Sequence, residues 1–182
     1  LRLYSSIVPA PIADLPSGGK SLRHHFTRTI HFGPDGRLYV SLGSSCNVCH
    51  EAEDKEYLAK VISMKKDGSD IQVFAKGLRN TVFFAWHPVT KELWGVDMGR
   101  DGLGDDLPPD EVNILKKDGN YGWPICYGKN IHDDDFDKNT YIRNPCMVPF
   151  ETPSTFDLPA HAAPLGVAFV PPGSQWPQEY WH

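Results

Sequence analysis

Short alternations of apolar and polar residues, separated by turn-forming residues, run along this chain. Residues 27–32 and 37–42 alternate in this way on either side of the turn sequence G-P-D-G at residues 33–36. A period of two is that of a β-strand with one buried face, and Pro-Asp-Gly favours a tight turn. The pattern therefore predicts a β-hairpin over residues 27–42.

The same phrase occurs twice more, at residues 82–96 and, in a weaker form, at residues 165–173. Its prolines, Pro34, Pro88 and Pro171, are 54 and 83 residues apart. A hairpin that returns after about 40–50 residues plus insertions is typical of β-propeller blades, whereas the strands of a β-sandwich do not repeat one turn sequence. We therefore predict an all-β fold, a β-propeller, with residues 1–182 as one partial propeller domain.

Other segments give weaker signals. Residues 3–8 form one possible strand, and residues 60–65 form another. Residues 51–58 contain neither Gly nor Pro and are rich in helix-forming residues, which favours a short helical turn or a loop. The runs 92–96 and 112–115 predict two strands joined by a long loop.

That long loop is acidic, and its glycines allow backbone carbonyls to turn toward a common point. Carboxylate and carbonyl oxygens are the ligands that calcium prefers, so the loop is a candidate calcium site. The alternative is a solvated acidic loop without a bound ion. The five acidic residues are Asp101, Asp105, Asp106, Asp110 and Glu111.

Composition narrows the class of protein. Forty per cent hydrophobic and 12% aromatic residues support a folded domain, and no apolar run is long enough to span a bilayer. The net charge of −5 argues against nucleic acid as a partner. Gly and Pro, 16 of each, are spread along the whole chain, as expected for many short strands.

The chain contains four cysteines, an even number that suits disulfides and therefore a periplasmic or secreted location. However, residues 46–50 read C-N-V-C-H, which is the attachment signature of haem c. A zinc site that uses the four cysteines with His50 is a third alternative, although the spacing is poor. The four cysteines are Cys46, Cys49, Cys126 and Cys146.

Several phrases together resemble the glucose/sorbosone dehydrogenase family, in particular its sorbosone-dehydrogenase-like branch. They are H-x-T-R-T-x-x-F-G-P-D-G-x-L-Y-V-S-x-G-S-S-C-N-V-C at 25–49, G-L-R-N at 77–80, G-R-D-G-L-G-D-D-L-P-P-D-E at 99–111, N-Y-G-W-P at 120–124 and L-P-A-H-A-A-P-L-G at 158–166. The resemblance implies a six-bladed propeller that uses pyrroloquinoline quinone (PQQ) and calcium. At roughly 45 residues per blade, this chain would supply about three to four blades and be a piece of a longer protein.

The resemblance also assigns roles to single residues. His25, eight residues before Gly33, matches the catalytic histidine that accepts the proton of the sugar hydroxyl as hydride passes to the quinone. Arg79 matches the arginine over the quinone carbonyl, where a cation stabilises developing negative charge. Asn80, Arg28 and His161 are assigned to cofactor binding, although His161 could equally be a structural histidine between prolines.

The implied calcium ligands lie in and after the acidic loop. Gly99 and Arg100 occupy the positions whose carbonyls bind the active-site calcium, but the glucose dehydrogenases have proline where this chain has Arg100. Glu111, by its carboxylate, and Tyr121, by its carbonyl, match a second, structural calcium site. The same branch of the family favours a Cys46–Cys49 disulfide over haem, and Cys126 would then pair with Cys146.

The function that we predict is that of a PQQ- and calcium-dependent dehydrogenase that oxidises an aldose or a related sugar and passes electrons to an external acceptor. One alternative is a non-catalytic, calcium-binding propeller that recognises a glycan or a protein. The other is an electron-transfer protein with haem at Cys46 and Cys49. His25 together with Arg79 favours the enzyme.

Overall fold

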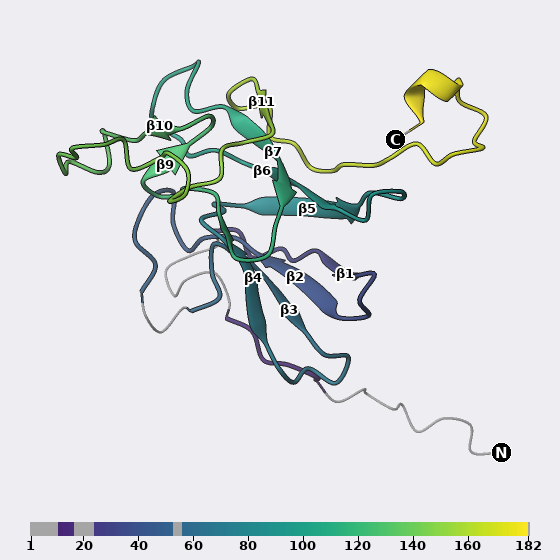
Figure 1. The fold of residues 1–182 in the computed structure, drawn as a ribbon. Helices are drawn as coiled ribbons and strands as arrows, with labels where there is room; N and C mark the ends of the chain where they lie inside the picture. The colour runs from purple at the N-terminus through teal and green to yellow at the C-terminus, as the bar shows by residue number, and fades with distance from the viewer. Residues whose placement is uncertain (1–10, 17–23, 53–55, 182) are drawn as a thin grey trace.

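The computed structural model describes residues 11–16, 24–52 and 56–181. Its regular structure is almost entirely β, with one short 3-10 helix, η2 (Gln178–Tyr180), in the described part (Figure 1). The predicted all-β class is therefore confirmed. The possible strand at residues 3–8 lies outside the described residues. The described part of the chain contains no helix long and apolar enough to cross a lipid bilayer.

The first sheet contains the predicted N-terminal hairpin. Its strands follow the order β1-β2-β3-β4-β8, antiparallel from β1 to β4, with β8 parallel to β4. Ile30 pairs with Val40 across the hairpin, so the turn at residues 33–36 sets the register as expected. The predicted strand after residue 60 is also present. The strands are β1 (Ile30–Phe32), β2 (Leu38–Leu42), β3 (Lys60–Met64), β4 (Gln72–Lys76) and β8 (Gly119–Asn120).

The second sheet contains the second copy of the hairpin phrase. Its order is β11-β7-β6-β5, all antiparallel, and the acidic loop joins β6 to β7 as predicted. A separate two-stranded hairpin interrupts the repeat between β8 and β11. The strands are β5 (Thr81–Trp86), β6 (Leu93–Asp97), β7 (Asp110–Leu115), β11 (Phe156–Leu158), β9 (Cys126–Tyr127) and β10 (Ile131–His132).

The two large sheets lie side by side and bury apolar residues between them, with β5 against β2 (Figure 1). Both faces of β2 and β3 are covered, because a second apolar cluster packs on the far side of the first sheet. Burial of both faces is what stacked propeller blades require. The cluster between the sheets consists of Tyr39, Val61, Ala75, Leu78, Phe84, Leu93, Leu115 and Tyr121.

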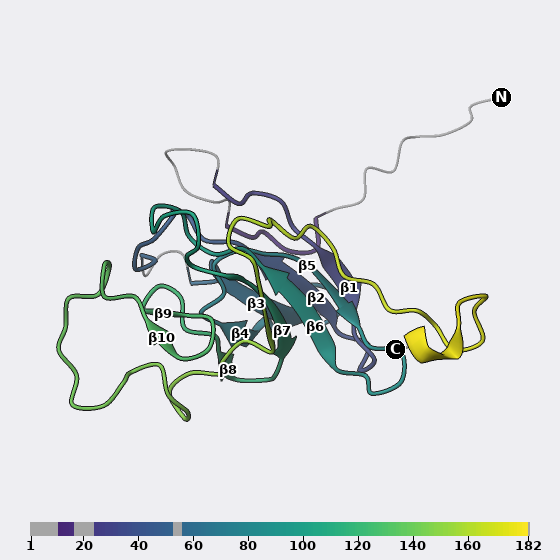
Figure 2. The same ribbon diagram turned by 90° about the horizontal axis from the view of Figure 1, so that it is seen from above.

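Each large sheet is built mainly from consecutive antiparallel strands, as propeller blades are. The described residues contain these two blade-like sheets, so the count of three to four blades and a closed propeller stay predictions. Segments 129–146 and 171–181 extend away from the sheets on opposite sides (Figure 2).

The prediction of a third hairpin at residues 165–173 is wrong. In the described structure, residues 165–170 form no strand. The Phe169 ring packs edge-on against His87 at 4.7 Å and Trp94 at 5.8 Å between ring centroids. Aromatic packing on the second sheet therefore replaces backbone pairing for this segment. The segment 51–58, for which a short helical turn or a loop was predicted, is described only in part. Residues 56–59 form a turn before β3, and residues 53–55 lie outside the described part.

Candidate functional site

The loop after β2 connects the two residues predicted to be catalytic. His25 Nδ1 lies 3.1 Å from the Ser44 carbonyl oxygen and 3.0 Å from Ser44 Oγ. The Ser44 amide in turn donates to the Arg79 carbonyl oxygen at 2.7 Å. Ser44 therefore joins the His25 loop to the G-L-R-N segment that precedes β5.

The partner of His25 also determines which ring nitrogen carries the proton. A carbonyl oxygen can only accept a hydrogen bond, so Nδ1 is the protonated nitrogen when it faces the Ser44 carbonyl. The Ser44 hydroxyl donates to the Cys46 carbonyl at 2.6 Å and can accept from the same Nδ1. Nε2 consequently keeps its lone pair and is the atom able to accept a proton from a substrate.

The electrostatics of His25 suit a base at neutral pH. Burial, and after it the positive charge of Arg79, lowers the pKa of His25 to about 4. The ring is therefore neutral across the physiological range. His25 also has a left-handed backbone with φ of 46°, an unfavourable conformation for a non-glycine residue that is found preferentially at functional sites.

Gly43 allows the close approach of two predicted site residues. A Cβ atom at this position would lie 2.3 Å from His25 Cβ and 2.6 Å from Asn80 Oδ1. No side chain fits in that space without moving its neighbours. The glycine is therefore a condition for bringing His25 and Asn80 together.

Asp97, at the end of β6, holds the backbone of the G-L-R-N segment. Its carboxylate accepts from the amides of Arg79 and Asn80, both at 3.0 Å, and from Thr81 Oγ1 at 2.8 Å. Burial raises the pKa of Asp97 to about 6, while these donors and Arg79 oppose the rise. The carboxylate therefore fixes the position from which Arg79 and Asn80 extend their side chains.

The Arg79 side chain is buried and donates to backbone and amide oxygens. Nε donates to the Asn47 carbonyl at 2.9 Å, Nη2 to Asn47 Oδ1 at 2.8 Å and Nη1 to the Met98 carbonyl at 3.2 Å. The nearest described carboxylate is that of Asp101, 3.6 Å from Nη2 and 75% exposed. Arg79 thus keeps a cationic head beside His25.

The two remaining predicted cofactor residues have other contacts. Arg28 donates to the backbone carbonyls of His25 at 2.5 Å, Thr27 at 2.8 Å and Pro16 at 3.0 Å, so it holds the loop that carries His25. His161 is exposed, and its Nε2 lies 2.9 Å from the Gly104 carbonyl in the acidic loop. His161 is therefore tied to the loop by a contact that leaves it outside the His25–Arg79 network.

The structure brings the four predicted metal residues to one small cavity of about 20 Å³. Such a volume holds about one water or one ion. The carbonyl oxygens of Gly99, Arg100 and Tyr121 accept none of the backbone or side-chain hydrogen bonds found among the described residues. These three carbonyls and the Glu111 carboxylate form a set of oxygen ligands that fits a calcium ion.

Two carboxyl groups in this region are buried: Glu111 lines this cavity, and Glu151 lines a separate hollow that shares Cys126 with it. Glu111 accepts from the Gly128 amide at 2.6 Å and from Asn113 Nδ2 at 2.9 Å; burial, and then the charge of Asp97, raises its pKa to about 8. Glu151 is 3% exposed, and neither of its oxygens has a partner in the described structure. Burial, and then the charge of Glu111, raises the pKa of Glu151 to about 8. Unpartnered buried carboxyl oxygens are what a bound cation would satisfy.

The side chain of Arg100 is neutralised by the segment between β10 and β11. Nε and Nη2 donate to both oxygens of Asp133 at 2.6 and 2.8 Å, and Nη2 also donates to Asp135 at 2.8 Å. This bidentate pair is buried, and it raises the pKa of Arg100. The arginine therefore adds little net positive charge beside this cavity.

All four cysteines are paired. Cys46 is bonded to Cys49 and Cys126 to Cys146, which confirms both expected disulfides. Thioether attachment of haem and thiolate ligation of zinc both need free sulfurs, which these bonds consume. The disulfides agree with an oxidising compartment.

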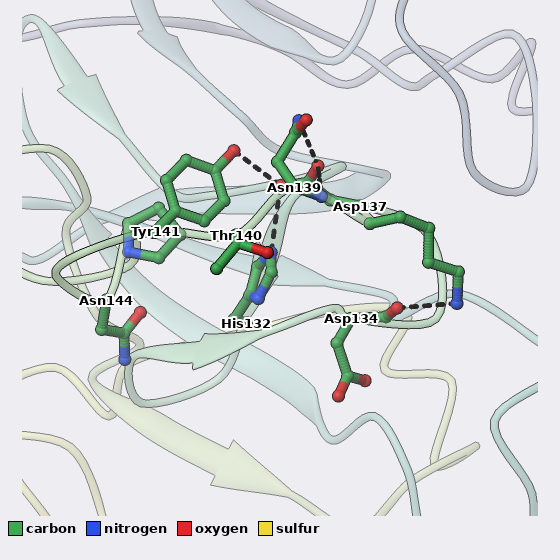
Figure 3. A pocket seen from close by; sticks show the side chains of 9 residues that line it. His132, Asp134, Asp137, Asn139, Thr140, Tyr141 and Asn144 are labelled. Carbon is green, nitrogen blue, oxygen red and sulfur yellow. Dashed lines mark hydrogen bonds and ion pairs between the residues drawn. The ribbon is translucent and has the colours of Figure 1, made fainter.

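A larger hollow of about 420 Å³ lies in the segment that follows β10. His132 and Tyr141 point to Asp137 (Figure 3). His132 Nε2 lies 3.0 Å from the Asp137 carboxylate, the Tyr141 hydroxyl donates to it at 2.7 Å, and Asn139 Nδ2 donates to it at 2.6 Å. These donors lower the pKa of Asp137 to about 2. The group is satisfied internally, so this hollow is a weaker candidate for chemistry than the His25–Arg79 cluster.

Sequence reasoning missed several residues that the site depends on. Gly43, Ser44 and Asn47 lie inside the quoted G-S-S-C-N-V-C phrase, and Asp97 lies two residues before Gly99, so their proximity to motifs was an available signal. Glu151 follows a proline-rich stretch and carried no signal.

Comparisons with known proteins identify the family of this chain. A family model described as Glucose / Sorbosone dehydrogenase matches residues 15–178. An uncharacterized protein of Borreliella burgdorferi is 38% identical over 147 residues, which cover 80% of this chain and 36% of the relative. The aldose sugar dehydrogenase YliI of Escherichia coli is 29% identical over 120 residues, covering 58% of this chain and 30% of that protein.

Solved structures share the fold. A family AA12 carbohydrate-active enzyme of Trichoderma reesei superposes with a TM-score of 0.67 at 22% identity, over 80% of this chain and 46% of that one. The PQQ domain of pyranose dehydrogenase from Coprinopsis cinerea gives a TM-score of 0.63 at 20% identity, over 83% and 47%. The chain thus spans less than half of these structures and about a third of the curated relatives.

Proposed function

The chain belongs to the glucose/sorbosone dehydrogenase family, and we propose that it provides the catalytic residues of a PQQ- and calcium-dependent enzyme that oxidises an aldose or a related sugar. The observation that carries the proposal is the hydrogen-bonded link from His25 through Ser44 to Arg79. The link joins the neutral base to the backbone of Arg79, and the positive charge of the Arg79 side chain acts on the His25 ring. Such a pair suits removal of a proton and a hydride from one C–H/O–H unit.

His25 is the proposed general base. Its Nδ1–H is directed to the Ser44 carbonyl, so Nε2 accepts the proton of the sugar hydroxyl. The lowered pKa, about 4, keeps Nε2 unprotonated at neutral pH. A pKa of about 4 also makes His25 a weak base in the resting protein. Proton transfer is therefore coupled to departure of hydride from the sugar carbon.

The donor set fits a quinone cofactor. Arg79 and Asn80 present a guanidinium and an amide from adjacent positions whose amides Asp97 holds. PQQ, when bound, supplies the two-electron acceptor for the hydride. Arg79 would lie at a quinone oxygen and stabilise negative charge there, and Asn80 would hold the edge of the cofactor. Arg28 acts on this site through the His25 loop that it holds.

Calcium is the second proposed group. The carbonyls of Gly99, Arg100 and Tyr121 and the Glu111 carboxylate would hold one ion, because the four residues line a single cavity with room for about one. This differs from the two separate calcium sites that the resemblance implies. The unpartnered oxygens of Glu151 support a need for a cation in this region. An external acceptor takes the electrons onward, and the disulfides favour a periplasmic or secreted location for the enzyme.

The test is sugar-dependent reduction of the cofactor by the full-length protein loaded with PQQ and calcium. We expect the cofactor spectrum to change on addition of an aldose without any dye, and to change at least a hundredfold more slowly in His25→Ala. Gln178→Ala, which removes an exposed amide side chain in η2, is the matched control. Calcium binding without any PQQ binding would favour the non-catalytic propeller instead.

A further inference from the structure

One asparagine connects a disulfide loop to the proposed catalytic arginine. Asn47 lies between Cys46 and Cys49, which are bonded to each other. Its carbonyl accepts from Arg79 Nε at 2.9 Å, and its side-chain oxygen accepts from Arg79 Nη2 at 2.8 Å. We propose that Asn47, held in the loop that the Cys46–Cys49 disulfide closes, is a positioning residue that orients the Arg79 guanidinium toward the cofactor. The proposal rests on the proposed function.

Two parallel bonds from one residue fix the plane of a guanidinium. Asn47 is itself held on its other side, because its Oδ1 accepts from the Asp101 amide at 2.8 Å and its Nδ2 donates to the Asp101 carbonyl at 3.0 Å. The amide therefore has one orientation that satisfies both neighbours. Asn47 joins the disulfide loop, Arg79 and the acidic loop in a single network.

The acceptors on Arg79 are neutral, and this distinguishes it from Arg100. Arg100 is paired with a buried carboxylate, which cancels its charge. Arg79 is instead oriented by amide and carbonyl oxygens, and its nearest carboxylate, at 3.6 Å, is exposed to solvent. Three of its five N–H groups donate to Asn47 and Met98. The carboxylates of Asp97 and Asp101 act on the guanidinium by their charge, but its direct hydrogen-bond acceptors are neutral, so these acceptors set its orientation.

The disulfide restricts the backbone that carries Asn47. A cross-link between residues 46 and 49 removes conformations that the open loop could reach. The Cys46 carbonyl also accepts from Ser44 Oγ at 2.6 Å, and Ser44 is the partner of His25. The loop therefore holds Arg79 directly and is tied to the residue that orients His25.

The first experiment measures kinetics on the full-length protein loaded with PQQ and calcium. Since a misplacement of about 1 Å costs roughly a hundredfold in rate, we expect Asn47→Ala to lower kcat by about 10- to 100-fold and to leave the sugar KM within about twofold. In a protein that already carries Arg79→Ala or Arg79→Lys, the addition of Asn47→Ala should lower kcat by a further factor of less than about two. The proposal would be overturned if Asn47→Ala lowered kcat by the same factor in the wild-type protein and in the Arg79 variants, or if it changed only KM. Gln178→Ala serves again as the control.

The second experiment uses the cofactor-free protein, so it holds even if the proposed function fails. Reduction by dithiothreitol transfers two electrons and two protons to the Cys46–Cys49 disulfide and leaves a cyclic disulfide in the reagent. Because coupling is reciprocal, Arg79→Ala should shift the equilibrium of this exchange toward the thiols by about threefold or more. Cys126–Cys146, in the same sample, should not shift. An unchanged Cys46–Cys49 equilibrium would show that the loop and Arg79 are not linked.

Discussion

Glu151 offers the sharpest test of the proposed cation requirement. The side chain is buried, neither oxygen has a partner in the described structure, and the charge of Glu111 acts on it. Replacement by Gln preserves the shape and removes the ionisable group. We predict that Glu151→Gln stabilises the calcium-free protein and weakens the stabilisation that calcium confers.

The magnitude follows from the pKa of Glu151, which rises from 4.5 to about 8 on folding. Between these values the native state holds a proton that the unfolded state has lost, so the calcium-free protein loses stability as pH rises from about 4.5 to about 8. At pH 7 this amounts to at most about 3 kcal/mol, at about 1.4 kcal/mol per pH unit. Because Glu111 titrates with Glu151, the two effects do not add fully.

Urea denaturation of the full-length protein at pH 7.5, in EDTA or in excess calcium, measures the effect. In EDTA, Glu151→Gln should raise the free energy of unfolding by about 1–3 kcal/mol. In calcium, the wild-type protein should gain more stability than the variant. Glu179→Gln, an exposed substitution in η2, is the control and should change neither value. If EDTA has no effect on the wild type, or if Glu151→Gln is less stable in EDTA, the reasoning is refuted.

Three further predictions concern the site. Because the pKa of His25 is about 4, kcat/KM for the sugar should stay constant as pH falls until about pH 4; an acid limb near 6.5 would contradict this. Gly43→Ala should lower kcat at least tenfold by separating His25 from Asn80, and kinetics equal to wild type would count against that contact. Asp133→Asn should lower the free energy of unfolding in urea by about 2–3 kcal/mol, because it leaves Arg100 partly unpaired; an unchanged value would refute it.

The hairpins could be predicted from local sequence patterns. The register of a hairpin depends on its turn and on the alternation of apolar and polar residues in its strands, and both lie close together in the sequence. The strands on either side of residues 33–36, and the pair that the acidic loop joins, are of this kind. The strand β11 could not be predicted in this way, because it pairs with β7 across about 40 residues and only three residues take part. The phrase at residues 165–173 matched the pattern, but Phe169 packs on aromatic rings of the second sheet and forms no strand.

The site likewise contains residues that the sequence identified and residues that only the structure reveals. The quoted phrases identified His25, Arg79 and Asn80, which the structure links through neighbouring backbone groups. Asp97 and Glu151 carry no sequence pattern, because their importance comes from burial and from what surrounds the carboxyl group. The folded arrangement alone shows that one is satisfied by three donors and the other by none.

Arg100 departs from the glucose dehydrogenase pattern, where proline holds this position, and a guanidinium beside a metal cavity would ordinarily repel a cation. In this chain Asp133 and Asp135 cancel that charge, and both lie in the segment that the Cys126–Cys146 disulfide closes. The carbonyl oxygen of Arg100 accepts no hydrogen bond found among the described residues. We infer that Arg100 and the segment between Cys126 and Cys146 act together, because a lone arginine would repel the proposed calcium ion and lone carboxylates would compete for it.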